Sequence, residues 1–100
     1  MAEHERKSRL IVDGVTSPKL PGHVKLRHDA GRGRWIMLAP ERVLQPDDVS
    51  VAILKLCDGS RSIDEISAVL AEEYSASVDE IRQDVIEFLQ DMADRGYIEG

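Results

Sequence analysis

The spacing of the apolar positions changes near residue 46, and the part before it has the pattern of a small sheet. Residues 24–28 alternate between apolar and polar side chains, which is typical of a half-buried strand. Residues 34–38 form an almost continuous apolar run that predicts a central strand, and residues 42–45 predict a short third strand that ends before Pro46. Residues 29–33 contain two glycines and an aspartate, which favours a hairpin loop between the first two strands.

Beyond Pro46 the apolar positions recur every three or four residues, which predicts three helices. The first is expected over about Asp47–Leu56. Asp47 or Asp48 would cap its first turn, because a carboxylate can accept from the free N–H groups there. Gly59 would provide a left-handed stop.

The second and third helices are each expected to begin at a capping box, in which a serine side chain accepts from the third helical N–H and a glutamate reaches back. The boxes are Ser62–Glu65 and Ser77–Glu80, and Gly96 is expected to end the third helix with Tyr97 and Ile98 behind it. An apolar stripe follows each helix: Ile66, Val69, Leu70 and Tyr74 on the second, and Ile81, Val85, Phe88, Leu89 and Met92 on the third.

This order of elements predicts an α+β domain: an N-terminal three-stranded antiparallel sheet followed by three α-helices, arranged like a winged helix-turn-helix. We expect the domain to occupy residues 19–100. Residues 1–18 are mostly polar and charged and end at Pro18, so we expect them to form a flexible N-terminal tail.

Length and composition place the chain among single-domain cytoplasmic proteins. A chain of 100 residues with 42% apolar content fits one globular domain. No apolar run approaches the roughly 20 residues that span a bilayer, and the charged N-terminus has no secretory apolar segment. The single cysteine, Cys57, cannot form an internal disulfide, which fits a reducing compartment. We therefore expect a cytoplasmic protein without a membrane partner.

Charge is divided unevenly along the chain. Residues 1–42 contain nine Lys or Arg and five Asp or Glu (+4), whereas residues 43–100 contain four and fourteen (−10). The asymmetry indicates two electrostatic faces, one of them able to attract an acidic partner, although an ordinary mixed surface would have the same totals.

The charge also weakens the DNA-binding function that a winged helix suggests. The third helix, which would read the DNA, has six acidic and two basic residues between Asp79 and Arg95 and would repel phosphates. DNA binding remains an alternative because the hairpin is basic, with Lys25, Arg27, Arg32 and Arg34.

The sequence shows no catalytic or metal-binding pattern. His23 and His28 lie five positions apart in an extended segment and would project to opposite faces. Cys57 is interpreted as a small buried hydrophobe rather than a reactive thiol. Gly31-Arg32-Gly33 precedes a strand and not a helix, so a hairpin turn is favoured over a phosphate loop. We therefore expect no enzyme activity, no cofactor and no metal.

One run of residues resembles a known family. The segment His23–Arg42 includes Leu26-Arg27, Asp29, Arg34-Trp35 and Leu38-Ala39-Pro40-Glu41-Arg42. These motifs are similar to the Leu-Arg-x-Asp, Trp and Leu-Ala-Pro-Glu-Arg run of the PqqD family of pyrroloquinoline quinone (PQQ) biosynthesis. The likeness continues through Ile53–Gly59, Ser62–Ile66, Asp84–Leu89 and Gly96–Ile98 and covers about residues 18–100.

The resemblance implies a peptide chaperone rather than a catalyst. Members of the PqqD family bind the short PQQ precursor peptide PqqA and present it to the radical-SAM enzyme PqqE, which crosslinks a Glu and a Tyr of the peptide. In this class of domain the peptide adds a strand to the sheet edge beside the third helix. For this chain the resemblance therefore implies PqqA as ligand and PqqE as partner.

The residues themselves fit strand addition. A three-stranded sheet leaves an exposed edge, which can pair with an incoming strand. The third strand is the expected edge. Four side chains of the third helix would line the groove, although a core position is favoured for each of them: Val85, Phe88, Leu89 and Met92. Ile81 is assigned to the core. Arg34 and Arg42 would pair with peptide carboxylates or stay solvated, and Trp35 is interpreted as a core anchor. The candidate peptide-binding residues are Arg34, Arg42, Val43, Leu44, Gln45, Val85, Phe88, Leu89 and Met92.

A further alternative gives the sheet edge to a second copy of the chain. The edge could pair with its own copy, or strands could exchange between protomers, which would make the protein a homodimer or a dimerisation scaffold.

Overall fold

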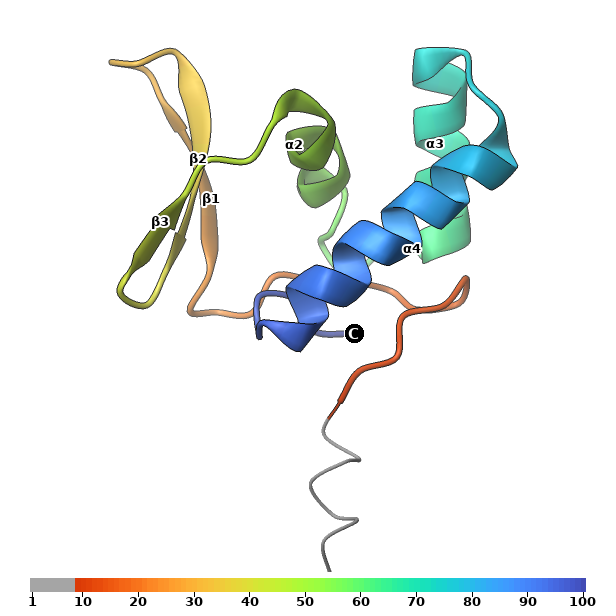
Figure 1. The fold of residues 1–100 in the computed structure, drawn as a ribbon, viewed down its shortest axis with the longest axis horizontal. Coiled ribbons are helices and arrows are strands. Elements are labelled where there is room, and N and C mark those ends of the chain that lie inside the picture. The colour runs from red at the N-terminus through yellow and green to blue at the C-terminus, as the bar shows by residue number, and fades with distance from the viewer. Residues whose placement is uncertain (1–8) are drawn as a thin grey trace, which may run out of the picture.

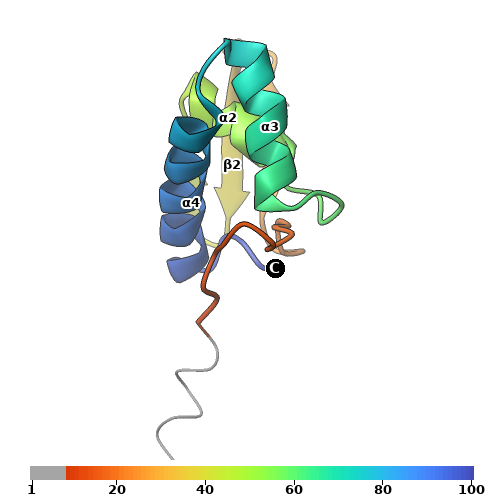
Figure 2. The same cartoon turned by 90° about the vertical axis from the view of Figure 1, so that its right-hand side faces the viewer.

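The computed structural model describes residues 9–100. Its elements are β1 (Lys25–Asp29), β2 (Arg34–Ala39), β3 (Arg42–Leu44), α2 (Asp48–Lys55), α3 (Ile63–Tyr74) and α4 (Val78–Asp94). The sheet lies at one side, α3 and α4 lie at the other, and α2 lies between them (Figure 1). The view from the helical side shows α3 and α4 in front of β2 (Figure 2). The predicted α+β order, three antiparallel strands followed by three helices, is confirmed; the winged-helix description stays a prediction.

The sheet is antiparallel with the order β1-β2-β3. Leu26, Met37 and Leu44 lie opposite one another in the register, so their side chains share one face. Met37 is buried, so this face is the one turned toward the helices. Trp35 lies on the same face and is half-buried, with Lys55 Nζ of α2 5.0 Å from its ring centroid.

The two turns of the meander have different chemistry. In the predicted loop after β1, the Asp29 carbonyl accepts from the N–H of Gly33 at 2.7 Å. Gly33 has a φ of 67°, a conformation that favours glycine. The turn between β2 and β3 instead places a non-glycine residue, Glu41, at a φ of 61°.

The first predicted helix is confirmed as α2, but its expected stop is wrong. Asp47 caps it, because its side chain accepts from the N–H of Ser50 at 2.8 Å. The helix ends at Leu56 in a right-handed conformation. Gly59 has a φ of 85° but lies beyond the helix, where its N–H donates to the carbonyl of Pro18 at 2.9 Å. The positive φ therefore turns the chain toward the N-terminal segment and does not cap α2.

One of the two expected capping boxes is present. Ser62 accepts from the N–H of Glu65, and the Glu65 side chain accepts from the N–H of Ser62. The second box is wrong, because Ser77 makes no side-chain bond at the start of α4. The predicted end of α4 is confirmed: Gly96 has a φ of 85°, and the N–H of Tyr97 donates to the Met92 carbonyl at 2.9 Å.

The core lies between the sheet and the three helices, with α3 contributing a narrower stripe than expected. Ile66 and Leu70 are buried as predicted, whereas Val69 and Tyr74 are 41% and 45% exposed. The buried face of α3 includes Ile66, Ser67, Leu70 and Ala71, and α4 packs against this helix.

The described part of the expected tail, residues 9–18, lies against the domain, and residues 1–8 lie outside the described residues. The first two N–H groups of α3, at Ile63 and Asp64, donate to the carbonyls of Thr16 and Gly14 at 2.8 and 3.0 Å. Helix N-termini leave such donors unsatisfied unless a partner is supplied. Backbone packing therefore begins upstream of residue 19, and the division of the chain at residue 18 stays a prediction.

No helix in residues 9–100 is long and apolar enough to cross a membrane.

Candidate functional site

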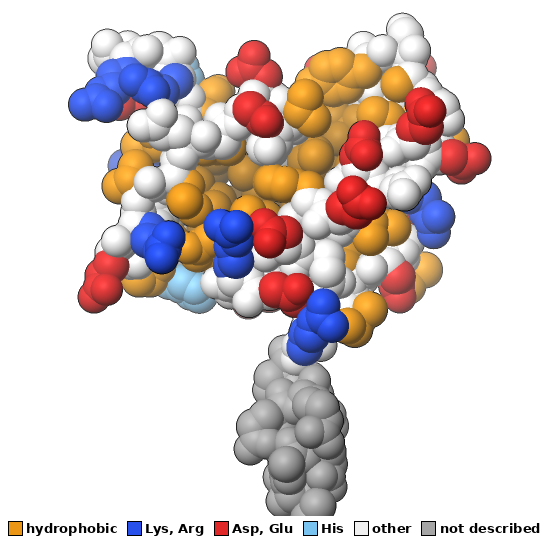
Figure 3. All heavy atoms as spheres, viewed as in Figure 1, with side chains coloured by type: hydrophobic (Ala, Val, Ile, Leu, Met, Phe, Trp, Pro, Cys, Tyr) orange, Lys and Arg blue, Asp and Glu red, His pale blue; other side chains and the backbone are white. Residues whose placement is uncertain are grey.

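A pocket of about 180 Å³ lies between the edge of the sheet and the C-terminal half of α4. Four elements or connections contribute to its lining: β2, the end of β3 with the chain after it, α2, and α4. The lining residues are Met37, Leu44, Gln45, Pro46, Ser50, Leu54, Phe88, Met92 and Arg95. Figure 3 shows hydrophobic side chains gathered in a hollow on this face of the molecule.

The local folding of each element explains why these side chains converge. Met37 and Leu44 are cross-strand partners on the face turned toward the helices, and they form the sheet wall. Phe88 and Met92 lie four positions apart on α4 and therefore one above the other on the same side of the helix. Leu54 is buried on α2 and lines the pocket from that helix.

The β3 strand borders this pocket and has a free edge. Among residues 9–100, β3 pairs with β2 alone. In an antiparallel ladder, alternate residues turn their N–H and C=O groups away from the partner strand, so part of the Arg42–Leu44 backbone faces outward. Pro46 cannot donate, so ladder pairing with an added strand would stop there.

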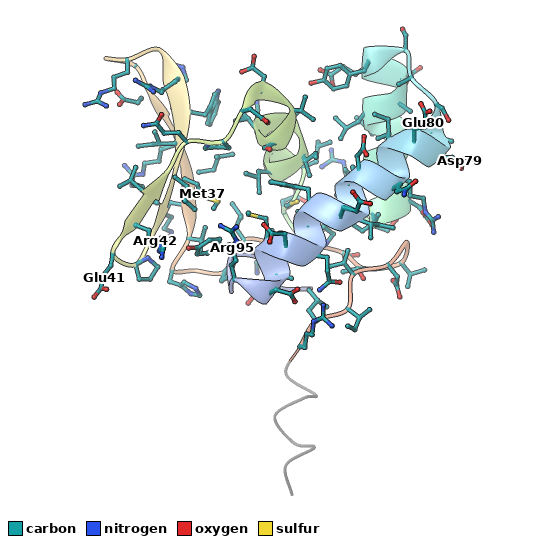
Figure 4. The ribbon with its side chains drawn as sticks, in the orientation of Figure 1. Met37, Glu41, Arg42, Asp79, Glu80 and Arg95 are labelled. Carbon is teal, nitrogen blue, oxygen red and sulfur yellow. The ribbon has the colours of Figure 1, made fainter. Side chains whose placement is uncertain are left out.

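The two ends of α4 differ in charge. Arg95 lies at its C-terminal end on the pocket rim, and Met37 of β2 lines the same pocket (Figure 4). Arg95 Nε is 3.3 Å from Asp91 Oδ2, one turn back on the helix. Asp79 and Glu80 lie at the opposite, N-terminal end (Figure 4). The first turn of α4 therefore carries two carboxylates, whereas at its C-terminal end Arg95 is paired with Asp91.

The structure brings together four of the nine residues predicted from the sequence. Leu44, Gln45, Phe88 and Met92 line the pocket. Leu89 is completely buried on the core side of α4. Val85 is also buried, and it contributes to a different pocket nearer the start of α4.

The remaining three predicted residues lie outside the pocket. Val43 is 63% exposed, because strand alternation turns it to the face opposite Leu44. Arg34 lies on β2, and its Nη1 donates to Gln45 Oε1 at 2.7 Å. Arg42 is exposed at the start of β3, on the same face as Leu44.

Five lining residues were not among the predicted site residues: Met37, Pro46, Ser50, Leu54 and Arg95. For two of them, the spacing of residues in the sequence could have indicated a place in the site. Arg95 lies three positions after Met92 and so extends the stripe of the third helix. Met37 falls on the same side of its strand as Trp35. The contribution of α2 had no such signal, because it depends on where that helix packs.

Cys57, His23 and His28 lie outside this pocket and are engaged in the fold. Cys57 is buried, its thiol donates to the Ile53 carbonyl at 3.3 Å, and burial together with the nearby Asp58 carboxylate raises the pKa of Cys57 to about 12. His23 Nε2 lies 3.3 Å from the Gly96 carbonyl oxygen, and His28 packs edge-on against Trp35. Within residues 9–100, no three His, Cys, Asp or Glu side chains are grouped to hold a metal ion.

Comparison with known proteins gives a consistent result. A family model described as Coenzyme PQQ synthesis protein D (PqqD) matches residues 34–98. The PqqA binding protein of Rhodopseudomonas palustris strain BisB5 is 52% identical over 89 residues, which is 89% of this chain and 87% of the relative. The PqqA binding protein of strain HaA2 is 57% identical over 89 residues, with the same coverage.

Two solved structures are also similar. The solution NMR structure of the PqqD part of Methylobacterium extorquens PqqCD, described as a functional and stand-alone recognition element for ribosomally synthesized and modified peptides, has a TM-score of 0.78 at 34% identity. That match covers 94% of this chain and 99% of that one. The crystal structure of PqqD from Xanthomonas campestris has a TM-score of 0.53 at 38% identity, covering 76% of this chain and 84% of that one.

Proposed function

Because this chain belongs to the PqqD family, we propose that it binds the precursor peptide PqqA in PQQ biosynthesis and holds it as an added strand on β3. The relatives are named PqqA binding proteins, and a structural relative is described as a recognition element for peptides of this kind.

One observation carries the proposal: the free edge of β3 lies directly beside an apolar pocket. Main-chain bonds to a strand edge provide affinity for any extended peptide, and a neighbouring pocket adds selectivity through alternate side chains. Leu44 belongs to both features, since it is a β3 residue and lines the pocket. A peptide strand on β3 would therefore turn every second side chain toward Phe88 and Met92.

The same proposal gives the chain the role of a carrier that presents PqqA to the radical-SAM enzyme PqqE and catalyses no step itself. The state of Cys57 supports this role. A buried thiol with a pKa near 12 holds almost no thiolate at neutral pH, and the thiolate is the nucleophilic form.

Amide NMR tests the binding site. Adding a synthetic PqqA peptide to the isotopically labelled full chain is expected to shift the backbone amides of Arg42–Gln45 and to slow their exchange, because an added strand protects N–H groups from water. If these amides do not change under excess peptide, β3 is not the binding edge.

A pair of variants on α4 tests the pocket. Phe88→Ala removes a pocket wall, whereas Ile86→Ala truncates another half-buried side chain of the same helix that does not line the pocket. We expect about tenfold weaker PqqA binding for Phe88→Ala, equivalent to about 1.4 kcal/mol, and little change for Ile86→Ala. Equal affinities for the two variants would argue against the pocket.

Single-turnover crosslinking of PqqA by PqqE tests the carrier role. The wild-type chain is expected to raise the rate, and Phe88→Ala is expected to lose most of that effect at a concentration where little peptide is bound. A rate that is independent of the chain would remove PqqE from the proposal while leaving peptide binding in place.

A homodimer stays a prediction, and it is linked to the same edge. A second copy paired along β3 would occupy the edge that PqqA needs, so light scattering with and without peptide would show a fall in mass on peptide binding. A mass that does not depend on peptide would place any dimer contact elsewhere.

A further inference from the structure

A second apolar pocket lies on α2 and α4 beyond the pocket at β3, and the face that holds both is called the groove below. It has a volume of about 190 Å³ and lies between α2, α3 and the N-terminal half of α4. Ile53, Leu70 and Val85 are its buried residues, and Val49, Tyr74 and Ile81 are its more accessible ones. For comparison, an apolar cavity of roughly 150 Å³ can hold benzene. The second pocket is therefore large enough for one bulky apolar side chain.

The two pockets are built on the same two helices. On α2, Val49 and Ile53 line the second pocket. The next residue after each, Ser50 and Leu54, lines the first pocket. On α4, a single stripe at helical spacing passes from the second pocket to the first: Ile81, Asp84, Val85, Phe88, Met92 and Arg95. The hydrophobic surface in Figure 3 extends in the same way from the sheet toward α3.

The length of this stripe matches a short extended peptide. Ile81 and Arg95 are 14 positions apart on α4 and its cap, which at 1.5 Å per residue is about 21 Å. An extended chain rises about 3.3 Å per residue, so six or seven residues span that distance. The three residues of β3 can pair with only about half of such a segment. The other half would continue past Pro46 along α2.

The charges around the second pocket indicate which kind of peptide residue would lie next to an apolar side chain inserted there. Asp84 contributes a carboxylate to the lining, and no ion pair involving Asp84 occurs within residues 9–100. Asp79 and Glu80 lie one turn away, toward the start of the helix. At the opposite end, Arg95 lies on the rim of the first pocket, in an ion pair with Asp91. Opposite charges across an interface fix the register and direction of a partner.

We infer that the precursor peptide continues from β3 into this second pocket, inserting one bulky apolar side chain that is flanked by a basic residue, and that this end of the groove sets the direction of the peptide. The inference rests on the proposed function, since it takes the same peptide as the occupant. Continuity with the β3 pocket and the acidic rim favour that occupant over a second copy of the chain, whose own helical half is acidic.

Filling the pocket tests the inference. Val49 is 55% exposed in the first turn of α2, so Val49→Trp can be accommodated in the fold while its ring blocks the pocket mouth. Val69→Trp is the matched control, at a 41% exposed position on α3 outside the pocket. With a synthetic Rhodopseudomonas palustris PqqA peptide, we expect at least fivefold weaker binding for Val49→Trp and less than twofold change for the control.

Two further measurements make the outcome decisive. In the methyl-labelled wild-type chain, intermolecular NOEs are expected from Val49 and Ile81 methyls to an apolar side chain of the peptide. Asp84→Asn is expected to weaken binding at low salt by three- to tenfold, and Glu87→Gln, at an exposed position on the same helix outside both pocket linings, by much less.

The inference is overturned if Val49→Trp binds as the control does and NOEs appear only at Phe88 and Met92, a result that leaves the β3 site intact. It is also overturned if Val49→Trp changes the mass of the peptide-free protein in sedimentation, since the pocket would then be a contact between copies. If Phe88→Ala has no effect either, the proposed function itself fails.

Discussion

Gln90 holds Val12 against α4 although the two residues are 78 positions apart in the chain. The Gln90 Oε1 atom accepts from the Val12 N–H at 2.9 Å, and its Nε2 donates to the Leu10 carbonyl at 2.9 Å. One side-chain amide thus satisfies a donor and an acceptor of the N-terminal segment, much as a neighbouring strand would. Val12 is buried beneath these bonds.

Gln90→Ala is expected to lower the free energy of unfolding by about 1–2 kcal/mol, because it leaves two partly buried backbone groups without partners. Urea denaturation would measure the change, and amide exchange at Val12 should accelerate. Gln83→Ala, at an exposed position on the same helix, is the control and should change stability by less than about 0.5 kcal/mol. Equal losses for both variants would mean that the Gln90 bonds contribute nothing specific.

The bonds of Gln90 illustrate what the sequence could not predict. The polar character of residues 1–18 predicts a tail, yet the described part of it, residues 9–18, is bonded to residues on α4 and at the start of α3. The pattern of apolar and polar residues within one segment does not indicate a hydrogen-bond partner 78 positions away in the chain. The elements themselves were predictable, because their signals lie within a few residues: the cap at Asp47, the box at Ser62 and the stop at Gly96.

The elements that form the candidate site were predictable from the sequence, but the residues that line it were predictable only in part. Helical spacing identified the stripe that contains Phe88 and Met92, and strand order identified β3 as an edge. Spacing alone does not separate Leu89, which faces the core, from Phe88, which faces the pocket, since both belong to one apolar stripe. That separation depends on the position of α2, which closes one side of the groove with Leu54.

The two serine caps offer a test of side-chain capping within one domain. Ser62→Ala removes the side-chain acceptor for the Glu65 N–H, which is one half of a reciprocal box, so we expect a loss of about 1 kcal/mol in unfolding free energy. Ser77→Ala removes no such bond and should cost only about 0.3 kcal/mol. Urea midpoints of the two variants measured together would show the difference, and a costlier Ser77 variant would contradict this assignment.

The buried thiol of Cys57 gives a pH-dependent prediction. Burial raises the pKa of Cys57 from 9.0 to about 12. A folded-state pKa above the unfolded value means that the folded protein binds the proton more tightly, so this contribution to stability is complete below pH 9 and is lost as the pH rises toward 12. Urea midpoints between pH 8 and 11 should therefore fall more steeply for the wild type than for Cys57→Ala.

Thiol labelling measures the same property directly. At pH 8, three pKa units reduce the thiolate fraction on the order of a thousandfold, so a disulfide reagent should modify the folded protein at least that much more slowly than the urea-unfolded chain. Labelling of the folded protein at a rate close to that of the unfolded chain would show that Cys57 is accessible and ionised.

Arg95 on the pocket rim predicts a salt-dependent contribution to peptide affinity. Arg95 lines the pocket, and its side chain is 52% exposed. Its charge would attract a carboxylate of the bound peptide, and salt would screen that attraction. Arg95→Gln is expected to weaken PqqA binding about threefold to tenfold at 20 mM salt, with the difference shrinking toward twofold at 500 mM. Arg82→Gln removes an equal charge from the same helix, at a site where Arg82 Nε donates to Asp64 Oδ1 away from the groove. Calorimetric titrations would measure the PqqA affinity of both variants at the two salt concentrations. A general charge effect would weaken binding equally in the two variants, whereas a contact at the groove would weaken binding only in Arg95→Gln.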